Sequence, residues 1–326
     1  MIENPFKYND YLEIIQNDEL SIIFEDDFDF KQAEERTEKL MSLFKEAAPV
    51  PVNSLLSRSV CLLGVSGCGK TNSLAVILEE MARSGVSFSV MDLEGDLSTI
   101  AEVAGLNVET KEVHTQKGEA GIYRLAAIAV KYRKRIIYSF GTDMTPDAIE
   151  YFVWHYLAGF RRVMEKLYKR RKRAPHIIVL DEAHVFLPQR PPKTRANYTR
   201  NIIYEATQIS RRGRKRGEGL LIASQRAADI VTSILSNMQV RFLMRVTEPA
   251  DKERYRHTLD SMRNMDYLRE IIKQVPTLRN GEAIYVPESN EAERVIFRLR
   301  DSFHPSATPG VEDYDDLSTI DLEELI

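Results

Sequence analysis

The sequence contains few cysteines and no long apolar run. Cys61 and Cys68 are the only cysteines in 326 residues, one in a predicted strand and one in the loop after it. That placement favours neither a disulfide nor a metal site. No apolar run approaches the roughly 20 residues that cross a membrane, and the opening stretch MIENPFKYNDYLEII lacks the basic and apolar regions of a signal peptide. We therefore expect a cytoplasmic protein in a reducing compartment, with no membrane partner.

The net charge is small, but charges of one sign are grouped along the chain. Lysine and arginine number 45 and aspartate and glutamate 49, which gives a formal net charge of −4. Residues 1–50 and the stretch after 311 are acidic, whereas basic residues gather at 169–173 and 211–216. A basic band in an otherwise acidic chain is typical of a polyanion-binding face. A solvated helix end explains 169–173 equally well.

The stretch GVSGCGKTN at residues 64–72 has the chemistry of phosphate binding. Gly64, four residues and then Gly69-Lys70-Thr71 match the P-loop pattern in full. Glycines let backbone amides approach a phosphate, the lysine reaches the β- and γ-phosphates, and the threonine hydroxyl binds Mg²⁺. An apolar run precedes the loop and a helical pattern follows it, as the motif requires. The residues predicted to bind ATP are Gly64, Ser66, Gly67, Cys68, Gly69, Lys70, Thr71 and Asn72.

Two further segments supply candidate catalytic groups. HIIVLDEAH, residues 176–184, reads as an apolar strand that ends in two carboxylates. Asp181 at the strand end suits Mg²⁺, and Glu182 suits a base that orients or deprotonates the attacking water. In LLIASQRAADI, residues 220–230, Gln225 ends another strand and is placed to bind the γ-phosphate or the attacking water.

The sequence Asp-Glu-Ala-His at 181–184 also resembles the motif of a different class of helicases. Helicases with that box have two recombinase-like domains, and their arginine-rich motif lies in the second. Here the similar stretch RRGRKRG begins at Arg211, too soon after Asp181 for a second domain to intervene. His184 is therefore predicted to be a packing residue or a support for the site.

The remaining patterns predict an α/β fold. Apolar runs indicate strands, and amphipathic stretches bounded by breakers indicate helices. Strands that alternate with helices favour a mostly parallel sheet covered on both faces. The predicted strands are 60–63, 87–91, 135–140, 177–180, 220–224, 240–244 and 283–286, and the predicted helices are 31–48, 72–81, 145–173 and 196–212.

Taken together, four motifs resemble the HerA/FtsK superfamily of motor ATPases, and most of all HerA-like proteins with the domain called DUF87. The motifs are the P-loop, DLEGD after the second strand, LDEAH, and GRKRGEGLLIASQR. The resemblance covers about Leu55 to Pro309 and implies a RecA-like (ASCE) sheet, with ATP between the subunits of a hexameric ring. It also implies movement along DNA, often beside a nuclease partner. HerA proteins usually begin with a small β-barrel that docks partners, whereas residues 1–63 look acidic and helical.

The resemblance further implies roles for single residues. Lys70 and Thr71 would bind the nucleotide and Mg²⁺, and Asp181 would support Mg²⁺. Glu182 would be the catalytic carboxylate and Gln225 the sensor of hydrolysis. An arginine from a neighbouring subunit would stabilise the charge of the transition state. The candidates are Arg211, Arg212 and Arg214, for each of which a solvent-facing or DNA-facing position remains open.

We therefore expect an acidic helical extension over residues 1–54, a RecA-like ATPase domain over 55–310 and an acidic tail over 311–326. The favoured function is a ring-forming, ATP-driven DNA translocase or helicase, because the basic band suits a polyanion. Two alternatives remain. One is an ATPase that moves or remodels protein, as in secretion, and the other is a subunit that assembles or regulates a partner effector, for example in defence.

Overall fold

The computed structural model describes residues 40–45, 50–114, 118–191, 196–259, 265–288 and 292–304. Within them, a nine-stranded sheet has the order β11-β10-β9-β3-β8-β7-β4-β6-β5. The strands from β9 to β5 run parallel, and β10 and β11 extend the sheet as antiparallel neighbours. Their bounds are β3 Ser59–Leu63, β4 Ser87–Asp92, β5 Glu109–Val113, β6 Arg135–Phe140, β7 His176–Leu180, β8 Glu218–Ser224, β9 Val240–Met244, β10 Glu282–Val286 and β11 Glu293–Ile296. The predicted mostly parallel α/β fold is confirmed.

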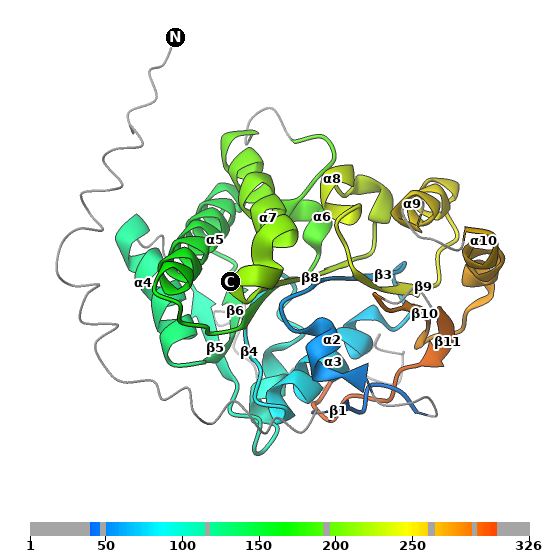
Figure 1. Cartoon of the computed structure of the whole chain (residues 1–326), viewed down its shortest axis with the longest axis horizontal. Coiled ribbons are helices and arrows are strands. Elements are labelled where there is room, and N and C mark those ends of the chain that lie inside the picture. Colours follow the sequence, from blue (N-terminus) through cyan, green and yellow to red (C-terminus); the bar gives the residue numbers. More distant parts are fainter. Residues whose placement is uncertain are drawn as a thin grey trace, which may run out of the picture.

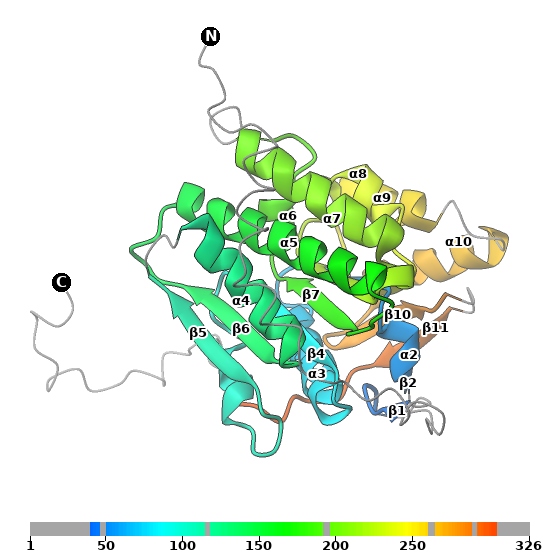
Figure 2. The same ribbon diagram turned by 60° about the vertical axis from the view of Figure 1, so that its left-hand side comes forward.

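Helices cover both faces of this sheet (Figures 1 and 2). On one face, α4 (Glu119–Lys131), α5 (Pro146–Lys169) and α7 (Ala196–Arg216) pack side by side, next to α6 (Ala183–Phe186), α8 (Thr232–Leu235), α9 (Pro249–Leu259) and α10 (Met265–Gln274). The other face carries α3 (Lys70–Arg83), α2 (Val52–Leu55) and the short helix η4 (Ser98–Glu102). No helix of the described part of the chain has the length and apolarity that a membrane crossing demands.

One apolar core lies on each face of the sheet, and the central strands contribute side chains to both cores. Cys61 and Leu63 of β3 belong to the core under α4, α5 and α7, whereas Val60 and Leu62 belong to the core under α3. Successive side chains of a strand point to opposite faces, so a strand buried on both faces must be apolar throughout. This is why the central strands are visible in the sequence as short continuous apolar runs.

The predicted helix over 31–48 is wrong where the structure describes it. Leu40–Met41 forms strand β1, which pairs with β2, Val50–Pro51. Phe44 forms a bridge with Phe297, and their rings lie 5.2 Å apart. These apolar side chains are buried against the α3 side of the sheet. That tertiary packing overrides the helix preference that the spacing of apolar residues had indicated. Residues 31–39, 46–48 and 311–326 lie outside the described residues.

The C-terminal stretch after β11 is fastened to helix α3. The buried carboxylate of Glu79 accepts hydrogen bonds from the backbone N–H groups of Asp301 and Ser302, each at 3.0 Å. The guanidinium of Arg298 forms ion pairs with Glu79 at 3.1 Å and Glu80 at 2.9 Å. A buried charge needs such donors to offset its desolvation, so α3 is held in place by chain far away in the sequence.

A buried polar network joins β4, β7 and α5. The His176 ring is fully buried, with Nε2 2.8 Å from Ser89 Oγ and Nδ1 3.1 Å from Ser87 Oγ. Ser89 Oγ lies 2.7 Å from the hydroxyl of Tyr156. Burial lowers the pKa of His176 to about 3, because an imidazolium there would be charged without a counter-ion.

His176 is expected to weaken the fold in acid. Its ordinary pKa of 6.5 applies when the chain is unfolded, and folding lowers it to about 3. As the pH falls below 6.5, His176 binds a proton in the unfolded chain but stays neutral in the folded chain. This difference lowers the free energy of unfolding by about 1.4 kcal/mol per pH unit. His176→Gln removes that term. Urea unfolding of both proteins between pH 7 and 4 should show the shallower pH dependence in the variant, and equal slopes would contradict the assignment.

Candidate nucleotide-binding site

The three segments predicted to carry the chemistry meet at one edge of the sheet. β3, β8 and β7 are neighbours, and in a parallel sheet their carboxyl ends lie together. The glycine loop and Lys70 follow β3, Asp181 and Glu182 follow β7, and Gln225 follows β8. This juxtaposition of residues from three strand ends is the structural core of the candidate site.

The loop from Gly64 to Gly69 has the shape of a phosphate cradle. Gly67 and Gly69 have φ values of 71° and 94°, a region that favours glycine. A Cβ on Gly69 would lie 2.9 Å from the backbone nitrogen of Gly281. That N–H of Gly281 donates to Cys68 O at 2.8 Å, so the turn before β10 supports the loop from behind. Because α3 begins at Lys70, its N-terminal end faces the loop and favours an anion there.

The other predicted loop residues divide into side chains that face solvent and side chains that do not. Ser66 is exposed, and Thr71 is partly exposed in the first turn of α3. Cys68 is buried with its Sγ 3.9 Å from Met244 Sδ, and burial raises the pKa of its thiol. Asn72 uses its carboxamide to accept from Arg300 N at 3.0 Å and to donate to Arg298 O at 2.9 Å. Asn72 therefore offers a phosphate only its backbone N–H group, and the N–H of Cys68 already donates to Val65 O at 3.3 Å.

Lys70 is the centre of the site. Its side chain is only 6% exposed, and its Nζ lies 2.6 Å from Glu182 Oε1 and 3.2 Å from Asp181 Oδ1. Burial is the largest influence on the pKa of Lys70 and lowers it, but the two carboxylates together raise this pKa above its ordinary value. The ammonium is thus charged and is balanced by the two carboxylates.

Glu182 accepts hydrogen bonds from two donors, Lys70 and Gln225, in a strained backbone conformation, and its buried Oε2 has no hydrogen-bond partner among the described residues. Its φ and ψ are 45° and 47°, in the left-handed region that non-glycine residues rarely adopt. Gln225 Nε2 donates to Oε1 at 2.8 Å, next to Lys70, and His184 Nδ1 lies 3.2 Å from Oε2. Burial tends to raise the pKa of Glu182, but the donors outweigh it and lower the pKa to about 2. The residue is an anion fixed in direction, as a base for water must be.

Two residues near this edge were not predicted as site residues. Asp92 ends β4, the neighbour of β7, and accepts hydrogen bonds from Gly95 N and Leu97 N at 3.0 Å each. Burial raises the pKa of Asp92 to about 7, and the charge of Asp181 adds to this. Gly281 is the other, through its contact with the glycine loop. The carboxylate at a strand end was a usable signal for Asp92, whereas Gly281 could not be found without the fold.

The three candidate arginines lie at the opposite edge of the sheet. Arg211, Arg212 and Arg214 are exposed on the last turns of α7, where Ser59 Oγ, at the start of β3, donates to Ser210 O at 3.3 Å. The five residues of β3, roughly 16 Å of extended chain, separate this end from the glycine loop. These arginines cannot reach a nucleotide bound at the glycine loop of the same chain.

The same edge gathers the two basic runs of the sequence. β7 and β8 start side by side, with His176 paired to Glu218, and α5 and α7 end just before them. Arg216 lies over the ring of Tyr168 at 5.9 Å. We call this surface the basic end, which comprises Lys169, Arg170, Arg171, Lys172, Arg173, Arg211, Arg212, Arg214, Lys215 and Arg216.

A family model and several known sequences match this chain. The family model described as "Helicase HerA, central domain" (DUF87) matches residues 42–302. The DNA double-strand break repair helicase HerA of Saccharolobus solfataricus is 36% identical over 151 residues, which are 44% of this chain and 27% of that protein. The HerA of Sulfurisphaera tokodaii is 32% identical over 148 residues, 44% of this chain and 28% of that protein. The chain thus matches little more than a quarter of the length of these relatives.

Solved structures share the fold. VirB4 of Thermoanaerobacter pseudethanolicus superposes with a TM-score of 0.53 and 12% identity, over 80% of this chain and 96% of that one. The genome packaging NTPase B204 of Sulfolobus turreted icosahedral virus 2, bound to AMPPCP, superposes with a TM-score of 0.50 and 14% identity. The match covers 74% of this chain and 99% of that one. These likenesses support the architecture of a P-loop ATPase.

The tight fit of Gly69 leads to a matched pair of substitutions. Gly69→Ala should lower the free energy of unfolding by about 2 kcal/mol or more, because its Cβ meets Gly281 in addition to a strained φ. Gly67→Ala meets nothing within 4 Å and should cost only about 1 kcal/mol for its φ. Urea unfolding without nucleotide measures both. A Gly69 variant as stable as the Gly67 variant would show that the loop does not rest on Gly281.

Proposed function

Because the chain belongs to the HerA central-domain family, we propose that it is an ATP-hydrolysing motor of the HerA type that works on DNA. The observation that carries the proposal is the meeting of Lys70, Asp181, Glu182 and Gln225 at the mouth of the glycine loop. Phosphoryl transfer needs a phosphate-binding cation, a metal ligand, and a group that orients water, and these side chains have those chemistries.

In this proposal each residue has one role. The loop amides and Lys70 bind the ATP phosphates, and the lysine leaves its carboxylate partners to do so. Thr71 and Asp181 hold Mg²⁺, which when bound neutralises phosphate charge. Glu182 orients the attacking water, and Gln225 reports whether the γ-phosphate is present. The contact between Gln225 and Glu182 supports that coupling, since one amide can bridge the carboxylate and the phosphate.

We further propose that the motor is a homo-oligomeric ring, of six subunits, in the cytoplasm. The position of Arg211, Arg212 and Arg214 supports a role between subunits, because they lie far from the glycine loop of their own chain. The basic end supports DNA as the polymer, since clustered lysines and arginines bind phosphate backbones with little regard for sequence. A nuclease or another effector protein is the proposed partner.

The domain organisation also remains a proposal: an extension over 1–54, an ATPase domain over 55–310 and an acidic tail over 311–326. The packing of Met41, Leu43 and Phe44 in the core next to α3 favours a start of the ATPase unit near residue 40 instead. The alternatives of a protein-moving ATPase or a regulatory subunit predict turnover that ignores DNA, so the response to DNA separates them from the motor.

Two substitutions separate binding from hydrolysis. Glu182→Gln should retain ATP binding but lower turnover by about a thousandfold or more, because the loop amides and Lys70 remain while the base is lost. Lys70→Ala should weaken binding itself, because it removes the charge that meets the phosphates. Fluorescent-ATP titration and phosphate release measure the two quantities, and wild-type turnover should rise with DNA at low salt. Unchanged turnover in Glu182→Gln would remove Glu182 from catalysis.

Mixed assemblies test the shared site. Glu182→Gln subunits and Arg211/Arg212/Arg214→Ala subunits should each be nearly inactive, since an arginine supplied in trans contributes about 10³–10⁵ in rate. Their mixture should regain part of the activity wherever an intact Glu182 meets intact neighbouring arginines. As a control, a mixture of Glu182→Gln with Lys70→Ala should stay inactive, because both defects lie on the same side of the site. A first mixture no more active than its components would exclude these arginines.

A further inference from the structure

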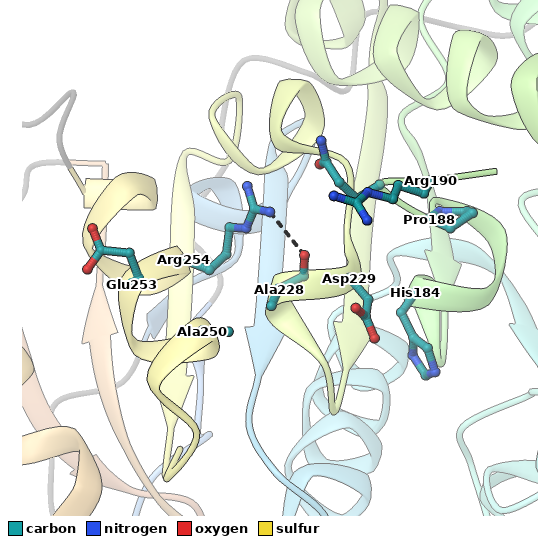
Figure 3. Close-up of a pocket in the computed structure, with 9 residues that line it drawn as sticks. His184, Pro188, Arg190, Ala228, Asp229, Ala250, Glu253 and Arg254 are labelled. Carbon is teal, nitrogen blue, oxygen red and sulfur yellow. Dashed lines mark hydrogen bonds between the residues drawn. The ribbon is translucent and has the colours of Figure 1, made fainter.

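Two surfaces adjoin the candidate nucleotide site, one on each face of the sheet. On the face of α8 and α9, a pocket of about 670 Å³ is lined by segments that follow β7, β8 and β9 (Figure 3). On the other face, the C-terminal stretch after β11, residues 297–304, contacts the first turn of α3. The proposed roles of Lys70, Asp181, Glu182 and Gln225 concern only the phosphates of ATP, so the base has no assigned contact.

The positions of the catalytic candidates give the direction in which the nucleoside extends. In a P-loop the lysine reaches the β- and γ-phosphates, and the loop amides hold the α- and β-phosphates. Glu182 and Gln225 follow β7 and β8, which lie on one side of β3 in the sheet. The γ-phosphate therefore belongs on that side. An extended triphosphate then directs its nucleoside toward the other side of β3, where β9, β10 and β11 lie.

The pocket of Figure 3 has neither the position nor the chemistry for the base. His184, one of its lining residues, lies with Nδ1 3.2 Å from Ser224 Oγ at the end of β8, so the pocket adjoins the γ-phosphate end. A base is best covered by apolar surface. Four of the nine lining residues drawn in Figure 3 are charged instead: Arg190, Asp229, Glu253 and Arg254.

The C-terminal stretch begins on the nucleoside side of the glycine loop. β11 ends opposite the start of β10, where Ile296 pairs with Glu282. The next residue, Phe297, donates its N–H to Gly281 O at 2.9 Å, and the N–H of Gly281 donates to Cys68 O of the loop at 2.8 Å. A single residue, Gly281, thus connects the C-terminal stretch to the glycine loop.

Asn72 fixes the stretch on both sides of Leu299. Its carboxamide donates to Arg298 O at 2.9 Å and accepts from Arg300 N at 3.0 Å. Asn72 directly follows Thr71 in the first turn of α3, so these two hydrogen bonds hold Leu299 beside the end of the glycine loop. This is the side toward which the nucleoside extends.

Leu299 is an exposed apolar residue on a fixed backbone. It is 74% exposed, whereas the N–H of Arg298 donates to Leu43 O at 3.0 Å. The guanidinium of Arg300 donates to Asp96 O at 3.2 Å and to Thr99 Oγ1 at 2.8 Å. Single exposed leucines are common on protein surfaces. This one stands on chain that is already ordered, so a ligand that covers it loses little affinity to ordering of the protein.

We propose that Leu299 forms the surface against which the base of the bound nucleotide packs, and that Asn72 is the positioning residue that holds Leu299 there. The inference rests on the proposed binding of ATP and adds to it the subsite for the base. An aliphatic side chain covers the flat face of a base without a hydrogen bond. The contact therefore supplies affinity in proportion to the apolar area that it covers.

Two probes separate the base from the phosphates: AMPPCP, which has a base, and inorganic tripolyphosphate, which has none. In calorimetric titrations of the full chain with Mg²⁺, Leu299→Ala should bind AMPPCP about tenfold more weakly than the wild type, because covering a leucine side chain contributes about that factor. Its affinity for tripolyphosphate should be unchanged. Leu299→Met should bind both probes as the wild type does, since methionine is apolar and of similar volume.

Phe303→Ala is the matched control. Phe303 is 71% exposed on the same stretch, but its carbonyl accepts from Thr99 Oγ1 of η4 at 2.6 Å. The chain just before it is bound by Glu79, about two turns along α3 from Asn72. Phe303→Ala should therefore bind both probes as the wild type does. An equal loss of AMPPCP affinity in Phe303→Ala and Leu299→Ala would overturn the assignment to Leu299.

The remaining outcomes separate this inference from the proposed function. A Leu299→Ala variant that binds AMPPCP as the wild type does overturns the inference alone. A Leu299→Ala variant weakened equally toward AMPPCP and tripolyphosphate has lost support for the glycine loop instead of a contact with the base, which also overturns the inference. A wild type that binds neither probe overturns the proposed function, and the inference with it.

Discussion

The pairing of one buried ammonium with two carboxylates is the constraint on which this site depends. Lys70 starts α3, and Asp181 and Glu182 follow β7, so the ion pairs connect two segments that a whole strand, β8, separates in the sheet. Buried charges are tolerated only when they are compensated. The ion pairs therefore hold the glycine loop, α3 and the end of β7 in their relative positions when no phosphate is bound. In the proposed function, a nucleotide that draws Lys70 away leaves two carboxylates that need a new cation, and Mg²⁺ would supply it.

Much of the fold could be predicted because the central strands are apolar on both faces. β6 and β9 have the predicted bounds, and β4, β7, β8 and β10 extend the predicted strands by one or two residues. The edge strands β5 and β11 were missed because ETKEV and ERVI are polar, as strands with one solvated face can be. The helix expected over 31–48 failed because spacing alone does not reveal that Met41 and Phe44 pack against chain from the far C-terminal side.

The residues of the candidate site could be predicted where they belong to short sequence motifs. Lys70, Glu182 and Gln225 follow apolar strands in recognisable patterns, and their meeting follows from parallel strands ending at one edge. The role of Gly281 depends on its contact with Gly69, far away in the sequence, whereas Asp92 ends a strand and accepts its hydrogen bonds from its own loop. The place of the arginines was also hidden, because α7 continues beyond residue 212, to Arg216, and carries them to the end opposite the glycine loop.

The attachments of α3 have a mechanical consequence. Near the first described residues, Ser42 N donates to Glu80 Oε2 at 3.0 Å, and near the last, Arg298 and Ser302 bind Glu79. Adjacent carboxylates on the helix that carries Lys70 thus anchor chain from both flanks of the ATPase unit. A load on either flank is borne by α3 through short charged contacts that yield little before they break. Lys70, which we propose binds phosphate, therefore lies on an element that would receive part of any tension applied through residues before 40 or after 304.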